Sequence, residues 1–175
     1  GVDATTRALV DLALAEDLGP GDLTSALVPE GRAGQAELHA KEALVLSGTE
    51  VFTEVFRRVD PAAQVRFHRG DGDALAPGEA AATVEGPVRA LLQAERTALN
   101  FAQRLSGVAT LARAAARAVE GTGARVVDTR KTTPGFRVLE KAAVAHGGAT
   151  NHRFGLFDGV LVKDNHVDAM RAEEH

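Results

Sequence analysis

Cysteine, tryptophan and tyrosine are absent from the 175 residues, and phenylalanine occurs only seven times. Without cysteine, a disulfide framework and a thiolate metal site are excluded, and the composition agrees with a reducing, cytoplasmic compartment. With so few aromatic side chains, a core must be built mainly from alanine, valine and leucine. The longest apolar runs span a few residues, whereas a membrane helix needs roughly 20, so we expect no membrane span. A basic stretch followed by an apolar segment is missing at the N-terminus, so we also expect no signal peptide.

Charge is unevenly distributed along the chain. The net charge of −4 argues against a nucleic-acid surface, since nucleic-acid-binding domains are usually strongly basic. The segment from 128 to 166 is different, because it carries a net charge of +2. Its basic residues are Arg130, Lys131, Arg137, Lys141, Arg153 and Lys163, and its acidic residues are Asp128, Glu140, Asp158 and Asp164. A basic segment on an acidic protein favours the binding of a small anion.

The first 105 residues have the pattern of a small α+β domain. Apolar spacing predicts a helix over 5–17, capped by Thr5 or Thr6, and a short helix over 50–59. Strands are predicted over 35–41, 43–46, 63–68 and 80–84, with glycine-rich and proline-containing turns between them. We therefore expect an α+β sandwich over residues 1–105.

A long helical pattern begins near residue 88 and extends to about 120, and we expect it to break near Ser106-Gly107. One face of this pattern is polar and consists of Gln93, Arg96, Asn100 and Gln103. Such a face is either ordinary solvated surface or a contact with another part of the protein. Spacing alone leaves both interpretations open.

A βαβ unit is predicted after residue 124, with strands starting at Val126 and at Val160 and a helix over 136–146 between them. Such a unit implies a parallel sheet or barrel, in which ligands bind at the carboxyl ends of the strands. Arg130, Lys131 and Lys163 follow the two strands, and the polar residues 151–153 lie in a loop or short strand between them. This arrangement predicts a site for a ligand with several carboxylates or phosphates. Each residue alone also has a simpler interpretation. Lys131 or Arg137 could be a solvated surface charge, and His152 could be a hydrogen-bonded structural histidine.

Several motifs are more specific than the spacing. They are Asp128-Thr129-Arg130-Lys131-Thr132-Thr133-Pro134-Gly135, Glu140-Lys141, Gly147-Gly148, Asn151-His152-Arg153 and Val162-Lys163-Asp164-Asn165-His166, with weaker matches at Ala94-Glu95-Arg96 and Arg104-Leu105-Ser106-Gly107. Together they resemble the quinolinate phosphoribosyltransferase family, over residues 8–166. The resemblance implies transfer of phosphoribose from phosphoribosyl pyrophosphate to quinolinate with decarboxylation. It also implies that residues 106–175 are the first part of an α/β, TIM-like barrel.

The resemblance implies a role for each matching residue. Arg130, His152 and Arg153 are expected to hold the quinolinate carboxylates, and Thr129 to bind substrate beside them. Lys131 and Lys163 are expected to lie near the pyrophosphate and the reacting centre, as the catalytic residues. Arg96 is expected to reach the active site of the partner subunit in a homodimer.

Members of the family continue beyond the position of His175, with further barrel strands and the acidic residues for ribose and magnesium. We therefore expect the barrel to be incomplete in this chain, with the ligands of a pyrophosphate-bound Mg²⁺ beyond residue 175 and no metal site among residues 1–175. For a 175-residue polypeptide alone we expect no phosphoribosyl transfer and weak amide protection over 124–166.

Two alternatives remain beside this interpretation. A paralogue of the same fold, such as the pyrophosphorylase-like protein associated with molybdenum transport, could act on another base. A non-catalytic dimerisation or carrier module is the second alternative. The carrier version requires a lysine at an exposed hairpin tip, and no lysine occurs between 42 and 130.

Overall fold

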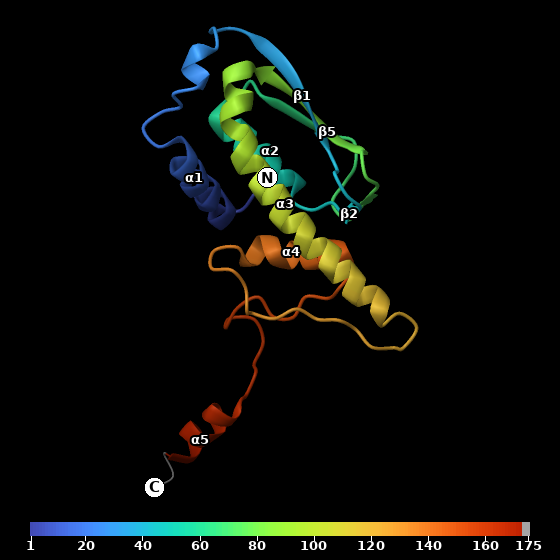
Figure 1. Ribbon diagram of the computed structural model, residues 1–175. Coiled ribbons are helices and arrows are strands. Elements are labelled where there is room, and N and C mark those ends of the chain that lie inside the picture. Colours follow the sequence, from blue (N-terminus) through green and yellow to red (C-terminus); the bar gives the residue numbers. More distant parts are fainter. Residues whose placement is uncertain (173–175) are drawn as a thin grey trace.

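The computed structural model describes residues 1–172 as a mixed α/β protein (Figure 1). Its first part consists of α1 (Ala4–Leu18), the 3-10 turn η1 (Ser25–Leu27), β1 (Ala33–His39), β2 (Leu44–Val45), α2 (Thr49–Val59), β3 (Gln64–Phe67), β4 (Ala74–Leu75) and β5 (Ala80–Pro87). Three helices follow, α3 (Val88–Ala118), α4 (Arg137–Gly147) and α5 (Asp164–Ala172). Within the described residues, no helix is both long and apolar enough to cross a membrane.

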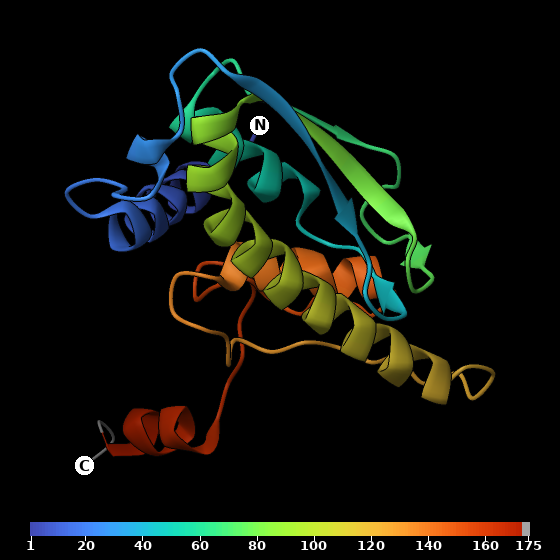
Figure 2. The ribbon, with the colours of Figure 1, turned by 45° about the horizontal axis from the view of Figure 1, so that its top comes forward.

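A three-stranded antiparallel sheet lies beside the helices, with β5 between β1 and β3. Glu85 of β5 is paired with Gln35 on one side and with Gln64 on the other, which fixes the register of all three strands. A second, two-stranded ribbon pairs β2 with β4. Figure 2 shows α2 and α3 along one face of the larger sheet. Their apolar faces supply much of the main core, whose buried members include Val10, Val51, Phe52, Val55, Phe56, Val84, Ala94, Ala98, Phe101 and Leu105.

The N-terminal helix begins one residue before the predicted range. Asp3 is the N-cap, and its Oδ1 accepts a hydrogen bond from the backbone N–H of Thr6 at 3.1 Å. The prediction of Thr5 or Thr6 as the cap was therefore wrong. An aspartate at this position satisfies one of the helix's free N–H groups, as the hydroxyl of a threonine would.

The long helix α3 is continuous from Val88 to Ala118, so the expected break near Ser106-Gly107 was wrong. A single glycine inside a helix costs only about 1 kcal/mol relative to alanine. Packing outweighs this cost, because Leu105 and Ala109 on either side are buried. The helix also runs through residue 105, where the sequence predicted the end of the first domain. That domain boundary remains a prediction.

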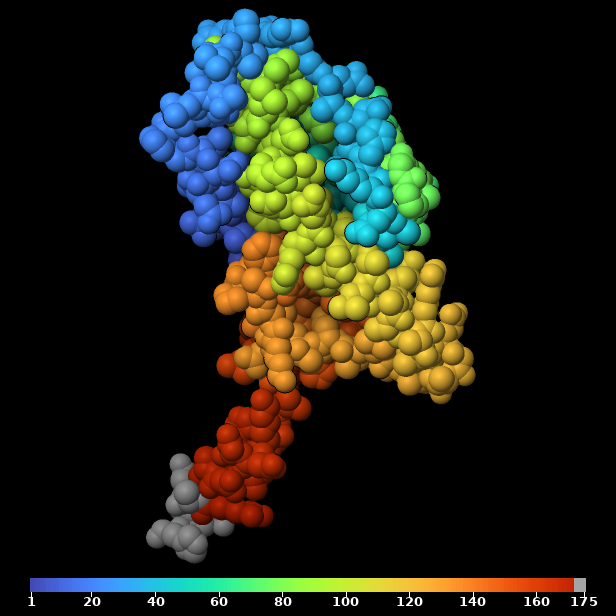
Figure 3. Space-filling view, in the orientation of Figure 1, coloured from blue at the N-terminus to red at the C-terminus, as the bar shows by residue number. Residues whose placement is uncertain are grey.

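The predicted parallel βαβ unit is present only in part. Val127 forms an isolated parallel bridge with Thr150, and α4 connects the two residues. The second predicted strand was wrong, since residues 160–162 form no strand and Val160 is 94% exposed. A strand requires hydrogen bonds from a neighbouring strand, and no described segment pairs with 160–162. Figure 3 shows the C-terminal segment extending away from the body of the molecule.

Helix α4 docks tightly against α3 at its C-terminal end. Arg113 of α3 donates from Nε to the carbonyl of Gly147 at 2.6 Å, and from Nη2 to the carbonyls of His146 and Gly72. Gly147 itself touches the backbone of α3, so that a Cβ there would lie 2.6 Å from the Cβ of Ala112. This contact holds the C-terminal end of α4 against α3.

Replacing Gly147 with alanine is expected to lower the free energy of unfolding by about 1–3 kcal/mol or more, because neither helix backbone can move away cheaply. The matched control is Gly107→Ala in α3, where no atom lies within 4 Å of the added Cβ. That change is expected to stabilise the protein by up to about 1 kcal/mol. Urea unfolding midpoints of both variants test this, and equal effects of the two would contradict the packing argument.

Candidate functional site

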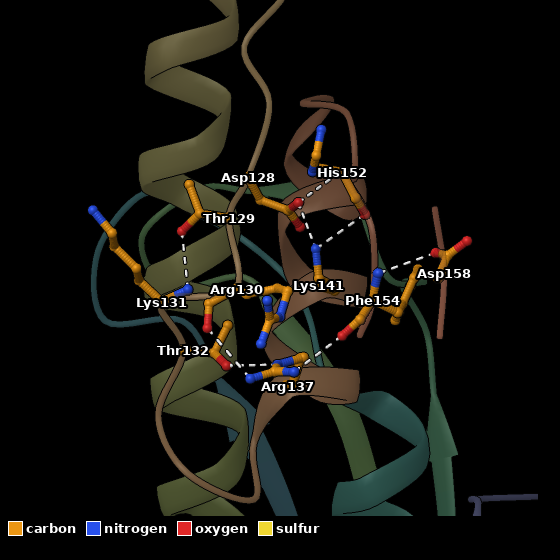
Figure 4. A network of polar contacts seen from close by, with 10 residues as sticks. All are labelled: Asp128, Thr129, Arg130, Lys131, Thr132, Arg137, Lys141, His152, Phe154 and Asp158. Carbon is orange, nitrogen blue, oxygen red and sulfur yellow. Dashed lines mark hydrogen bonds and ion pairs between the residues drawn. The ribbon is translucent and has the colours of Figure 1, made fainter. Parts of the chain in front are cut away.

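Asp128 joins two segments that are far apart in the sequence. Its Oδ1 accepts a hydrogen bond of 2.6 Å from the backbone N–H of His152, next to the bridge between Val127 and Thr150. The carboxylate therefore brings the cationic residues after Val127 close to those after Thr150. The expected convergence is thus present in part: residues 128–131 meet the loop 151–153, whereas the second predicted strand end, at Lys163, does not join them. Figure 4 shows Asp128 beside His152.

Lys141 of α4 lies at the centre of this meeting point, with 1% of its side chain exposed. Its Nζ lies 2.6 Å from Oδ1 of Asp128 and donates to the carbonyl of His152 at 3.2 Å. The ring of Phe154 covers the ammonium group, with 5.1 Å between Nζ and the ring centroid. The amide of Asn151 lies against Oδ2 of Asp128 and the carbonyl of Lys141, and with its nitrogen turned toward them it donates to both at 2.8 Å.

Glu140, the neighbouring residue of α4, fixes the loop that follows Lys131. Its Oε2 accepts from the backbone N–H of Thr133 at 3.1 Å, and its Oε1 accepts from Nη2 of Arg104 at 3.0 Å. Arg104 also donates to Oγ1 of Thr133 at 2.7 Å, so α3, α4 and the loop meet at one carboxylate. Burial acts to raise the pKa of Glu140, but the hydrogen bonds from Thr133 and Arg104 outweigh it and hold the pKa below its usual value.

This lowered pKa makes stability depend on pH in a defined direction. As the pH falls, the unfolded chain takes up the Glu140 proton first, near 4.5, so stability present above this value is lost as the pH falls through the lower folded pKa. We expect Glu140→Gln to flatten this acid limb of the unfolding midpoint against pH below about pH 5. Glu95→Gln is the control, because Glu95 is exposed and its carboxylate accepts no hydrogen bond from the described residues. Parallel acid limbs for Glu140→Gln and the wild type would contradict the assignment.

Three of the predicted site residues follow Asp128 directly. Thr129 is exposed, and its Oγ1 accepts from the backbone N–H of Lys131 at 3.1 Å. The Lys131 side chain is exposed and is directed away from the other labelled side chains in Figure 4. Arg130 is half-buried, and its Nε is buried without a hydrogen-bond partner among the described residues. An unpartnered buried donor is rare in folded proteins, and it is the type of group that a ligand acceptor satisfies.

The other predicted residues are placed less uniformly. His152 is exposed, and the guanidinium of Arg153 has a single hydrogen bond within residues 1–172, to the carbonyl of Gly159 at 3.5 Å. Lys163 is not brought to this group, because it directly precedes α5, which Figure 1 shows separated from the body. Arg96 is exposed on α3 and has no contact with residues 128–153 through a hydrogen bond or ion pair in the described part of the chain.

Glu140-Lys141 was recognised in the sequence as a motif, but neither residue was given a role, although the two organise the site. Arg137 was considered a possible solvated charge, whereas it donates to Oγ1 of Thr132 and to the carbonyls of Phe154 and Arg130. One signal was available, because Glu140 and Gly147 lie on one helical stripe with buried Ala143. No group of three His, Asp or Glu residues able to hold a metal ion occurs among residues 1–172.

Two family models match nearly the whole chain. The N-terminal domain of quinolinate phosphoribosyl transferase matches residues 3–106, and the C-terminal domain of the same family matches residues 108–174. The chain belongs to the quinolinate phosphoribosyltransferase family. The family expected from the motifs in the sequence is thereby confirmed.

The names of similar proteins agree with the assignment to the quinolinate phosphoribosyltransferase family. The probable nicotinate-nucleotide pyrophosphorylase [carboxylating] of Bacillus subtilis is 47% identical over 154 residues, covering 88% of this chain and 53% of the relative. The chloroplastic nicotinate-nucleotide pyrophosphorylase [carboxylating] of Arabidopsis thaliana is 43% identical over 165 residues, covering 93% of this chain and 47% of the relative. The solved structure of the nicotinate-nucleotide pyrophosphorylase from Francisella tularensis superposes with a TM-score of 0.90 at 36% identity, covering 99% of this chain and 64% of that one. The chain thus spans about half the length of the curated relatives it matches.

Proposed function

We propose that this segment belongs to an enzyme that transfers phosphoribose from phosphoribosyl pyrophosphate to quinolinate and releases CO2 and pyrophosphate, giving nicotinate mononucleotide. The names of the relatives support this reaction, since they are carboxylating nicotinate-nucleotide pyrophosphorylases. Among the cations that Asp128 brings together, one observation carries the proposal: Nε of Arg130 is buried without a hydrogen-bond partner among the described residues, in the stretch that the C-terminal family model matches.

In this proposal Arg130, His152 and Arg153 bind the two carboxylates of quinolinate, with Thr129 beside them. A guanidinium group suits this task because its planar N–H groups form two parallel hydrogen bonds with a carboxylate. Lys131 lies near the pyrophosphate and the reacting carbon of the ribose. Lys163 joins the site when the remaining barrel segments hold residues 155–163, since in the described chain this part is largely exposed.

The chemistry requires fixed positive charge more than a general base. Departure of pyrophosphate from C1 leaves oxocarbenium-like charge on the ribose, and the pyridine nitrogen attacks that carbon. Cations held in place stabilise the leaving pyrophosphate and keep both carboxylates in a reactive pose. Loss of the carboxylate next to the nitrogen leaves carbanion-like charge on the ring, which nearby cations also stabilise.

The proposal also covers the rest of the barrel, the partner subunit, the metal ion and the location of the protein. The incomplete TIM-like barrel is completed by segments beyond residue 175, and Arg96 enters the site of a partner subunit in a homodimer. Magnesium would arrive with pyrophosphate, and the described residues of this chain form no cluster of acidic or histidine side chains that fits it. The cytoplasmic location stays a prediction, and the Arabidopsis relative is named as chloroplastic.

The proposal is tested by comparing quinolinate with nicotinate, which lacks one carboxylate. In the full-length enzyme, quinolinate is expected to bind about ten- to a hundredfold more tightly, because loss of a charge-assisted pair costs about 1.5–3 kcal/mol. Calorimetric titration of both ligands measures the ratio. Equal affinities would contradict the proposal and favour a paralogue acting on another base.

A further inference from the structure

Lys141 is the most buried charged side chain of the described residues, and the proposed reaction leaves it without a task. A lysine with 1% of its side chain exposed is uncommon, because removing an ammonium group from water is costly unless it is paired and hydrogen-bonded. Its Nζ meets Asp128, the carbonyl of His152 and the face of Phe154. The chain thus retains a costly group at the one point where the two cationic segments meet.

The partners of Lys141 are the residues next to the proposed carboxylate ligands. Asp128 is two positions before Arg130, and the same Oδ1 that contacts Nζ accepts the backbone N–H of His152. The carbonyl of His152, which precedes Arg153, is the second acceptor for Nζ. One ammonium and one carboxylate therefore fix Arg130 relative to His152 and Arg153.

Lys141 itself is a poor candidate for an anion ligand. Its charge is neutralised by Asp128 at 2.6 Å, and its ammonium lies beneath the ring of Phe154. Arg130 and Arg153, by contrast, form no ion pair with a carboxylate among the described residues, so their charge is available to an anion. Lys141 must therefore act through its neighbours if it acts on the ligand at all.

We propose that Lys141 is a positioning residue, and that its ion pair with Asp128 sets the spacing between Arg130 and the His152-Arg153 pair on which selection of a dicarboxylate depends. This inference rests on the proposed function. Two carboxylates on adjacent carbons of one ring require donors at a fixed separation. A small shift of one segment therefore weakens quinolinate binding while leaving the binding of a single carboxylate nearly unchanged.

The test uses the double variant Lys141→Met/Asp128→Asn in the full-length enzyme. Methionine fills a similar volume without charge, and the asparagine side chain keeps an oxygen for the N–H of His152, so no buried charge is left unpaired. The matched control is Arg113→Met, which removes the hydrogen bonds holding the C-terminal end of α4 and touches neither Asp128 nor residues 151–153. Dissociation constants for quinolinate and nicotinate and the melting temperature are measured for each protein.

We expect the ratio of nicotinate to quinolinate dissociation constants to fall about tenfold or more in the double variant. In Arg113→Met the ratio should stay at the wild-type value even where the melting temperature is lower. If the double variant does not fold, Asp128→Asn alone is used. Its side-chain oxygen can still accept from Nζ of Lys141 and from the N–H of His152, so this variant should lower the ratio less, in the same direction.

A folded variant that keeps the wild-type ratio would overturn the inference and leave Lys141 a purely structural residue. An equal fall in Arg113→Met would also overturn it, because general loosening of α4 would then explain the effect. A wild-type enzyme without preference for quinolinate would overturn the proposed function, and this inference with it. The first two outcomes leave the proposed function standing.

Discussion

Full-length subunits carrying Arg96→Ala, mixed with subunits carrying Lys131→Ala, are expected to recover activity that neither variant has alone. If Arg96 acts across a dimer interface, both lesions of a heterodimer fall in one composite site and leave the other intact. Random exchange of equal amounts makes half of the dimers heterodimers, so about a quarter of all sites become active. Steady-state rates before and after exchange measure the recovery.

The structure gives this prediction its physical basis. Arg96 lies eight residues before Arg104, or about 12 Å along the axis of α3, and Arg104 is the residue of α3 that touches the loop after Lys131. The Arg96 side chain is exposed, and no described hydrogen bond connects it with its own subunit's cationic group. A second subunit is therefore the simpler route for Arg96 to reach a site containing Lys131.

A reciprocal mixture serves as the control. Subunits carrying both Arg96→Ala and Lys131→Ala are mixed with wild-type subunits, so that every heterodimer has one lesion in each site. If Arg96 acts across the interface, exchange lowers the activity of this mixture by about half. If Arg96 acts in its own subunit, exchange changes nothing here and the first mixture stays inactive, which would contradict the assignment.

Helices α1 to α4 were predicted well from the sequence, apart from the break expected in α3, and the reason is local; α5 was not predicted. The apolar positions of α2, α3 and α4 repeat over three or more turns, so each helix carries its own signal. The strands of the sheet were predicted for a similar reason, since turn residues separate them. Residues 160–162 have the same apolar composition, yet they form no strand, because a strand also depends on a partner elsewhere in the chain.

The cations of the candidate site were predicted from the sequence, whereas the buried Lys141–Asp128 pair at its centre was not. Arg130 and His152 stand in motifs that can be read directly, and the structure brings their segments together. The Lys141–Asp128 pair depends on tertiary packing, because it joins α4 to a segment outside the helix, and α4 itself lies against α3 through the close contact of Gly147. A contact between residues distant in sequence gives only a weak signal in the local sequence pattern. Here the signal is a pair of charged residues, Glu140 and Lys141, on the buried side of a helix.

The 175-residue polypeptide expressed alone is expected to show a sharp boundary in amide exchange near residue 155. Amides of α3 and of the β1-β5-β3 sheet should be protected, because these elements carry the buried core. The amides of helix α4 should be protected as well, since its residues Ala143 and Lys141 are buried. From the sequence alone, weak amide protection was predicted over all of residues 124–166. The structure restricts this expectation to the residues after about 155.

Residues 155–163 should exchange with an opening free energy near zero. The strand they were expected to form has no partner in the described chain, and Phe157 and Val160 are 89% and 94% exposed. Gly147→Ala serves as the comparison, because undocking α4 should raise exchange over 137–147 and leave the sheet unchanged. Hydrogen exchange followed by mass spectrometry resolves the three regions. Protection through 155–163 equal to that of α4 would contradict the prediction, because this segment would then have a partner that the single chain does not provide.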